Sequence, residues 1–303
     1  MEYTLYLVSE NGLSKDEQHL LLEEAKSFAG QNIEGVFSTT SEIRYENRQT
    51  GVYFQIYYAA AGQNDAAGVK LIPDDYYDTG LAFKIPYFKG IFFAYEAIWR
   101  LVNLCNNYNL LVLNPHTTPE DEPPEPMEVN FDDLVENYKD LNAKVSQELI
   151  KEERFQEIYY YLSEKEALQW WNFMFHKDYL VEQYQSGEGI FVPTLMLVNK
   201  PGTREVYRAL IMKTGLTTLF PDADLVMVMD EEGNAKAWKT EAFIKKGPSP
   251  VKQLEFQNRT YTCVKLDYAP KEGDKNKPVG EFDDYNIIPA SSVHTEDLRE
   301  MIS

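Results

Sequence analysis

The sequence lacks several features that mark particular protein classes. Its two cysteines, Cys105 and Cys263, are too few for a disulfide scaffold or a cysteine zinc site, and we expect both to be small buried residues. No run approaches the roughly 18 apolar residues of a membrane helix, and the N-terminus has no basic segment before a long apolar run. These absences predict a soluble cytoplasmic protein.

Recognised catalytic motifs are also missing. The sequence has no phosphate-binding loop, no dinucleotide-binding glycine fingerprint and no nucleophile elbow. Its four histidines lie far apart in sequence, without the spacing of a metal-binding pair: His19, His116, His176 and His294. The sequence therefore favours a protein without catalytic activity, and it predicts no cofactor and no metal.

The sequence has fewer positively charged residues than negatively charged ones. The chain has 29 Lys and Arg residues against 49 Asp and Glu residues, which gives a formal net charge of -20. Nucleic-acid-binding proteins neutralise phosphates with clustered Lys and Arg, so this balance argues against a nucleic-acid partner, and anionic membranes are disfavoured for the same reason. Basic proteins, cations and uncharged small molecules remain as partners.

The residues that are present predict a folded protein of two domains. Hydrophobic residues make up 44% of the chain and aromatic residues 14%, which is enough to build a core. At 303 residues the chain is longer than one ordinary domain, so two domains are expected.

Residues 1–116 are predicted to form the first domain. Alternating apolar residues predict strands, and capping residues followed by apolar repeats at spacings of three and four predict helices. In chain order these are a strand at 3–8, a helix at 14–29, a hairpin at 41–58, a strand at 81–86, a helix at 92–108 and a strand at 110–113. This order matches the split βαβ pattern, so we expect a ferredoxin-like domain with one additional strand.

Residues 117–129 are predicted to be an acidic linker rich in proline. Its prolines disfavour a regular helix or a central strand, and carboxylates fill the gaps between them. We expect the linker to be accessible to proteases, with little capacity for backbone pairing.

Residues 130–303 are predicted to form a second α+β domain. Asn130 is expected to cap a helix with a narrow apolar stripe. Ser163 and Glu166 form a capping box for a second long helix, which has apolar residues on nearly every side and should be mostly buried. From residue 189 onward the apolar period changes to two, and short connections separate six predicted strands. We expect an antiparallel meander.

One loop concentrates side chains that could bind a ligand. The segment Asp74, Asp75, Tyr76, Tyr77 and Asp78 brings together three carboxylates and two phenols, a composition suited to a hard cation or a basic partner. His116 follows a predicted strand end, where α/β proteins often place functional side chains. The alternative for the acidic segment is solvated loop charge, since it lacks the spacing of a calcium loop, and the alternative for His116 is a loop histidine at a domain boundary.

Other charged features have structural interpretations. Glu96 precedes Arg100 by four residues, which predicts an ion pair on a solvated helix face. His176 lies in an aromatic stretch and is predicted to pack between rings. Residues 119–140 hold nine acidic residues and one Lys, and this run can be a linker or an element that docks on a basic protein.

Two functions from different classes follow. The first is a non-catalytic interaction protein whose acidic surface binds a basic protein partner, as an inhibitor or immunity-type factor would. The alternative is an enzyme or small-molecule binder with a site between the two domains, built from the loop residues 74–78 and His116.

Overall fold

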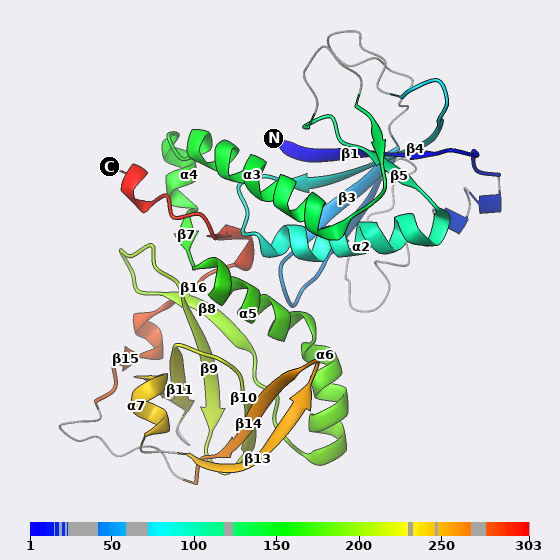
Figure 1. The fold of residues 1–303 in the computed structure, drawn as a ribbon. Helices are drawn as coiled ribbons and strands as arrows, with labels where there is room; N and C mark the ends of the chain where they lie inside the picture. The colour runs from blue at the N-terminus through cyan, green and yellow to red at the C-terminus, as the bar shows by residue number, and fades with distance from the viewer. Residues whose placement is uncertain are drawn as a thin grey trace. The chain divides into compact units, whose positions relative to one another are not determined.

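The structure is a computed structural model that describes residues 1–14, 16–17, 20–21, 23, 42–58, 72–117, 124–229, 233–245, 248–267 and 277–302. The chain divides into two compact units (Figure 1). The first unit comprises Met1–Glu157 with Glu300–Ser303, and the second comprises Ile158–Arg299. Both units mix helices with sheets, so the α+β class predicted from the sequence is confirmed.

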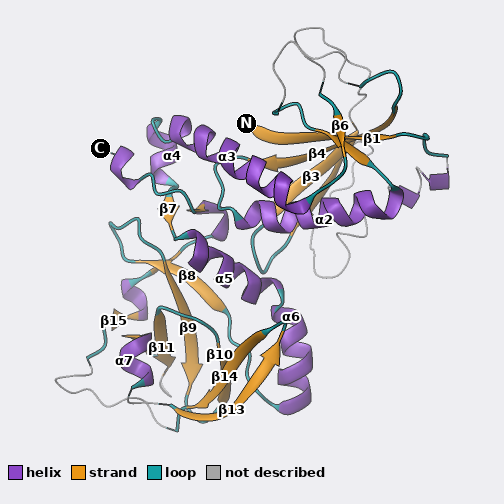
Figure 2. Ribbon diagram, viewed as in Figure 1, coloured by secondary structure: helices purple, strands orange, loops and turns teal. Residues whose placement is uncertain are grey.

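A six-stranded sheet forms the centre of the first unit (Figure 2). Every neighbouring pair is antiparallel, in the order β2-β3-β4-β1-β5-β6. The strands are β1 (Glu2–Ser9), β2 (Glu42–Glu46), β3 (Tyr53–Tyr58), β4 (Tyr77–Pro86), β5 (Leu111–Leu113) and β6 (Pro126–Met127). Tyr3, Leu5 and Leu7 of β1 alternate along the strand and are fully buried, as the period of two requires.

Two long helices of the first unit lie side by side, α2 (Phe92–Tyr108) and α3 (Phe131–Leu149) (Figure 1). The side chain of Asn130 accepts a hydrogen bond from the Asp133 amide, so the predicted cap of α3 is present. Tyr138 anchors α3, because its hydroxyl donates to the Pro86 carbonyl at 2.8 Å. The sequence assigned this helix to the second domain, but it belongs to the first unit, as does the short helix α4 (Glu153–Glu157). An apolar stripe does not reveal which core it will contact.

The predicted linker is only partly described, because residues 118–123 lie outside the described residues. The expected lack of backbone pairing is wrong for its later part. Pro126 and Met127 form β6 and pair with Leu113 and Val112 of β5. Proline is tolerated here because β6 lies at the edge of the sheet in the described part of the chain. The chain therefore rejoins the sheet of the first unit before α3 begins.

The second unit holds two larger sheets and one short strand pair. The larger sheet has the order β15-β12-β11-β9-β8-β16, and it comprises β8 (Leu195–Asn199), β9 (Tyr207–Lys213), β11 (Leu225–Met229), β12 (Ala235–Lys239), β15 (Gly280–Glu281) and β16 (Asn286–Ile287). The three-stranded sheet has the order β10-β14-β13, from β10 (Thr217–Phe220), β13 (Ser249–Phe256) and β14 (Arg259–Lys265). The pair joins β7 (Tyr160–Tyr161) to β17 (Val293–His294).

The strands of the second unit do not form the single antiparallel meander expected from the sequence. β10 leaves the larger sheet and pairs with β14 instead. The chain then returns at Leu225, and β11 lies parallel to β9. Short connections favour antiparallel neighbours, but they do not require consecutive strands to pair with one another.

The predicted helix from Ser163 to Gln185 is not continuous. It comprises α5 (Glu164–Phe175), α6 (Lys177–Leu180) and a π-helical segment (Val181–Ser186), with a break at His176. Phe173 is buried, as expected, but Tyr179 is 55% exposed. The remaining short elements are the helix α7 (Thr240–Ile244) and 3-10 turns at Phe282–Asp284, Ala290–Ser292 and Arg299–Met301.

The predicted helix at 14–29 lies largely outside the described residues. Its capping box is present, because the Glu17 amide donates to Ser14 Oγ and the Ser14 amide donates to Glu17 Oε2. None of the helices in the described part of the chain combines the length and the hydropathy needed to cross a bilayer.

Candidate functional site

The acidic loop singled out in the sequence lies at the surface of the first unit. The side chains of Asp74, Asp75, Tyr77 and Asp78 are exposed. Asp78 accepts a hydrogen bond from the Gly80 amide at 2.7 Å, which shapes the start of β4. Tyr76 packs instead against an apolar cluster of Val8, Ile72 and Leu113. The loop therefore offers three carboxylates and one phenol to solvent, and its second phenol serves packing.

His116 is part of an aromatic cluster in the first unit. Its ring stacks on Tyr3 with 5.2 Å between centroids, and its Nε2 accepts a hydrogen bond from the Thr4 amide at 3.1 Å. Burial lowers the pKa of His116. Both contacts suit a neutral imidazole that fixes the end of β5 against β1.

The structure does not bring His116 to the acidic loop. His116 binds the backbone at Thr4, whereas Tyr77 pairs with Ser9 at the other end of β1. Five residues of extended strand separate these points by roughly 16 Å. The loop and the histidine are therefore two separate places within the first unit.

Glu96 is a buried carboxylate that the sequence reading placed in solvent. Its exposed fraction is 0%, so the predicted solvated helix face is wrong at this position. Tyr45, Asn47 and Thr50 each donate a side-chain hydrogen bond of 2.7 Å to it. The carboxylate thus fastens β2 and the β2–β3 turn onto α2. A helical spacing pattern shows which residues share a face, but it cannot show that polar partners on another element cover that face.

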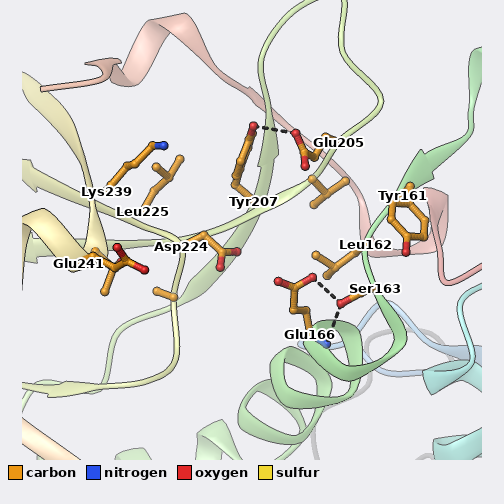
Figure 3. A pocket seen from close by; sticks show the side chains of 13 residues that line it. Tyr161, Leu162, Ser163, Glu166, Glu205, Tyr207, Asp224, Leu225, Lys239 and Glu241 are labelled. Atoms are coloured by element: carbon orange, nitrogen blue, oxygen red, sulfur yellow. Dashed lines mark hydrogen bonds between the residues drawn. The ribbon is translucent and has the colours of Figure 1, made fainter. Parts of the chain in front are cut away.

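A recess in the second unit gathers charged side chains from distant parts of the sequence (Figure 3). It lies where α5 begins beside the N-terminal ends of the parallel strands β9 and β11, and its volume is about 400 Å³. Its polar lining residues are Tyr161, Ser163, Glu166, Glu205, Tyr207, Asp224, Lys239, Thr240 and Glu241. Figure 3 shows the carboxylates of Glu166 and Asp224 directed into the same space.

One of these carboxylates is committed to a buried ion pair. Asp224 Oδ1 accepts from Arg208 Nη2 at 2.8 Å, and Asp224 Oδ2 accepts from Arg208 Nε at 3.1 Å and from the Arg208 amide at 2.8 Å. Arg208 is 6% exposed, and its Nη1 donates to Gln169 at 2.9 Å. Burial acts to lower the pKa of Arg208, but the hydrogen bonds and charge of Asp224 outweigh it and raise that pKa. The pair stays ionised and joins β9 to the start of β11.

The other carboxylates leave the recess acidic. Glu166 accepts a hydrogen bond from the hydroxyl of Ser163, and Glu205 accepts one from the hydroxyl of Tyr207 at 2.9 Å. Glu166 Oε1 also lies 3.9 Å from Arg208 Nη2, so Glu166 shares that guanidinium with Asp224. Lys239 is the lysine among the described lining residues, and Glu205 and Glu241 outnumber it once Glu166 is counted with Arg208. Such a recess attracts a cationic group that can be shared among carboxylates and phenols.

The sequence held only indirect signals of this recess. Ser163 and Glu166 were read as a capping box, and Ser163 Oγ does accept the Glu166 amide at 3.4 Å. Asp224 follows Pro221 and Asp222 in a stretch whose composition is typical of a turn. Glu205 and Glu241 carry no local motif at all. The recess exists because α5, β9, β11 and β12 converge, and that convergence follows from strand pairing rather than from sequence spacing.

Comparisons of the chain with protein-family models, with curated proteins and with solved structures find no match. Within the described residues, no group of three or more His, Cys, Asp and Glu side chains is arranged to hold a metal ion. The acidic recess is therefore the feature of the described residues from which a function can be inferred.

Proposed function

We propose that this protein is a non-catalytic binding protein that recognises a basic protein partner, and that the acidic recess of the second unit receives a basic side chain of that partner. The observation that carries the proposal is the excess of carboxylates over lysine among the described residues that line a space of about 400 Å³. That volume falls within the size range of ligand sites and exceeds what one Lys or Arg side chain fills.

The net charge of -20 supports the same partner class. A strongly acidic protein attracts basic partners over long distances and speeds their association, while complementary charges in the recess would fix the bound orientation. This electrostatic contribution decreases as salt concentration rises, because the screening length is about 8 Å at physiological ionic strength.

Binding of a capped hexa-arginine peptide, measured by calorimetry at two salt concentrations, tests the proposal. The double variant Glu205→Gln with Glu241→Gln should weaken binding about tenfold, because it removes two carboxylates that meet the guanidinium groups. The matched control is Asp75→Asn with Glu136→Gln, which removes the same charge from exposed positions of the first unit. It should change binding by less than about twofold once salt screens distant charges.

Equal losses in the two double variants would mean that overall charge alone attracts the peptide, and the recess would then have no specific role. Spermidine serves as a second probe. If spermidine binds as tightly as the peptide and competes with it, the protein is a small-cation binder instead. That outcome would favour the alternative function, a small-molecule binder.

Three finer expectations accompany this proposal. The antiparallel order β3-β4-β1-β5 supports a ferredoxin-like first unit, to which β2 and β6 add one strand at each edge, one more than the sequence predicted. The acidic balance supports the exclusion of nucleic acid. Two buried free cysteines, Cys105 and Cys263, support a reducing compartment such as the cytoplasm.

A further inference from the structure

A second cavity continues the acidic recess within the second unit. It has a volume of about 720 Å³, and both cavities are lined by Ser163, Glu166, Ala223 and Thr240. Shared lining residues make the two cavities neighbouring parts of one groove. The groove passes the N-terminal end of α5 and reaches the three-stranded sheet.

The second cavity differs from the first in its chemistry. Its apolar wall consists of Phe220, Pro221, Ile244, Pro248, Pro250 and Val264. Thr260, Thr262 and Val264 alternate along β14, so they line the groove from one face of that strand. Hydroxyl groups beside an apolar wall suit an extended backbone that carries an apolar side chain.

The side chain of Ile244 is not buried against the rest of the fold. Its exposed fraction is 54%, whereas its neighbour Phe243 is 1% exposed and faces the core. Ile244 ends α7 and lies on the wall of the second cavity. A large apolar side chain placed on a concave surface gains most from a partner that covers it.

The junction of the two cavities holds an unused polar atom. The side-chain oxygen of Thr240 is buried, and it has no hydrogen-bond partner among the described residues. Thr240 lines both cavities, and its backbone amide donates to the Asp224 carbonyl at 3.0 Å. A buried hydroxyl without a partner costs free energy.

We propose that the groove binds an extended segment of the partner in which a basic residue and an apolar residue stand at a fixed spacing. The basic side chain enters the acidic recess, and the apolar side chain packs against Ile244 and Val264 in the second cavity. The basic half of this inference rests on the proposed function, whereas the apolar half rests on the second cavity alone.

Selection of random heptapeptides displayed on phage against the full chain tests the inference. The expected outcome is enrichment of Arg or Lys together with an apolar residue at one spacing. Selection on Ile244→Ser should keep the basic residue and lose the apolar one. Selection on Glu205→Gln with Glu241→Gln should lose the basic residue. Ile244 is exposed, so its replacement should leave the melting temperature unchanged, and a thermal melt checks this.

The best enriched peptide is then synthesised with its apolar residue replaced by Ser. This change should weaken binding about tenfold to the unaltered protein and by less than about twofold to Ile244→Ser, as coupled positions require. Basic peptides without a spaced apolar residue would overturn the two-cavity inference and leave the proposed function standing. Selection without basic residues would overturn the proposed function. A spaced apolar residue whose effect does not depend on Ile244 would refute the placement in the second cavity.

Discussion

At the scale of one residue, Glu96 joins α2 to β2 and to the β2–β3 turn by accepting three side-chain hydrogen bonds. Replacing Glu96 by Ala would leave the buried hydroxyls of Tyr45 and Thr50 and the half-buried amide of Asn47 without this acceptor. Each unsatisfied buried group costs about 1–3 kcal/mol, so we expect the two buried hydroxyls alone to lower the free energy of unfolding by at least about 2 kcal/mol. Urea denaturation of Glu96→Ala measures the loss. The control Glu136→Ala changes an exposed residue of α3 and should stay within about 0.5 kcal/mol.

A single residue, His116, should make the stability of the first unit depend on pH. Because burial lowers its pKa in the folded chain, the unfolded chain takes up the proton at higher pH. The free energy of unfolding should therefore fall as pH drops below about 6.5, and the contribution of neutral His116 is complete above that pH. In the variant His116→Gln this part of the pH dependence should disappear. Thermal melts between pH 5 and 7 show it, and an unchanged slope would contradict it.

At the scale of elements, the buried ion pair of Arg208 with Asp224 joins β9 to the start of β11. In Asp224→Asn the buried guanidinium of Arg208 is left with the more distant Glu166, at 3.9 Å, and the free energy of unfolding should fall by about 3 kcal/mol. The matched control is Asp297→Asn, which breaks the exposed pair of Asp297 with Arg299 and should cost less than about 1 kcal/mol. Chemical denaturation of both variants compares them. Equal small losses would mean that Arg208 finds another partner.

Capping residues made the first residues of the long helices predictable. The break within the second helix and the pairing of the strands could not be predicted in this way. Asn130 and Ser163 cap their helices as their side chains indicated. The break at His176 was not predicted, because neither Pro nor Gly marks it. The parallel register of β9 with β11 was missed for a different reason. Period-two patterning identifies a strand without naming its neighbour.

The site was less predictable than the fold for the same physical reason. The compact acidic loop drew attention because its residues are adjacent in sequence, yet its carboxylates spread into solvent. Glu205 and Glu241 are 36 positions apart, and only the folding of β9, β11 and β12 brings them to one recess. The acidic balance of the chain could be read from the sequence, because the excess of carboxylates is a property of composition.

The division of the whole molecule changes the expected result of proteolysis. Residues 117–128 remain the predicted site of first cleavage, because prolines and carboxylates dominate there. The two fragments should nevertheless elute together under native conditions, since β6 pairs with β5 and Tyr138 of α3 binds the Pro86 carbonyl. Size-exclusion chromatography followed by denaturing electrophoresis shows this. Separate elution would mean that the segment after the cut does not depend on the first unit.

The pairing of β7 with β17 has a consequence for synthesis on the ribosome. Tyr159 donates to the carbonyl of Glu296, 137 positions later, and accepts from the amide of Leu298. The second unit is thus closed by the two ends of its own segment, and a nascent chain cannot form these contacts until residues 296–298 have left the exit tunnel. Until then this part of the nascent unit remains incomplete, and chaperones can bind it. Joining these neighbouring ends by a short loop and opening the chain elsewhere would give a circular permutant that forms this contact early.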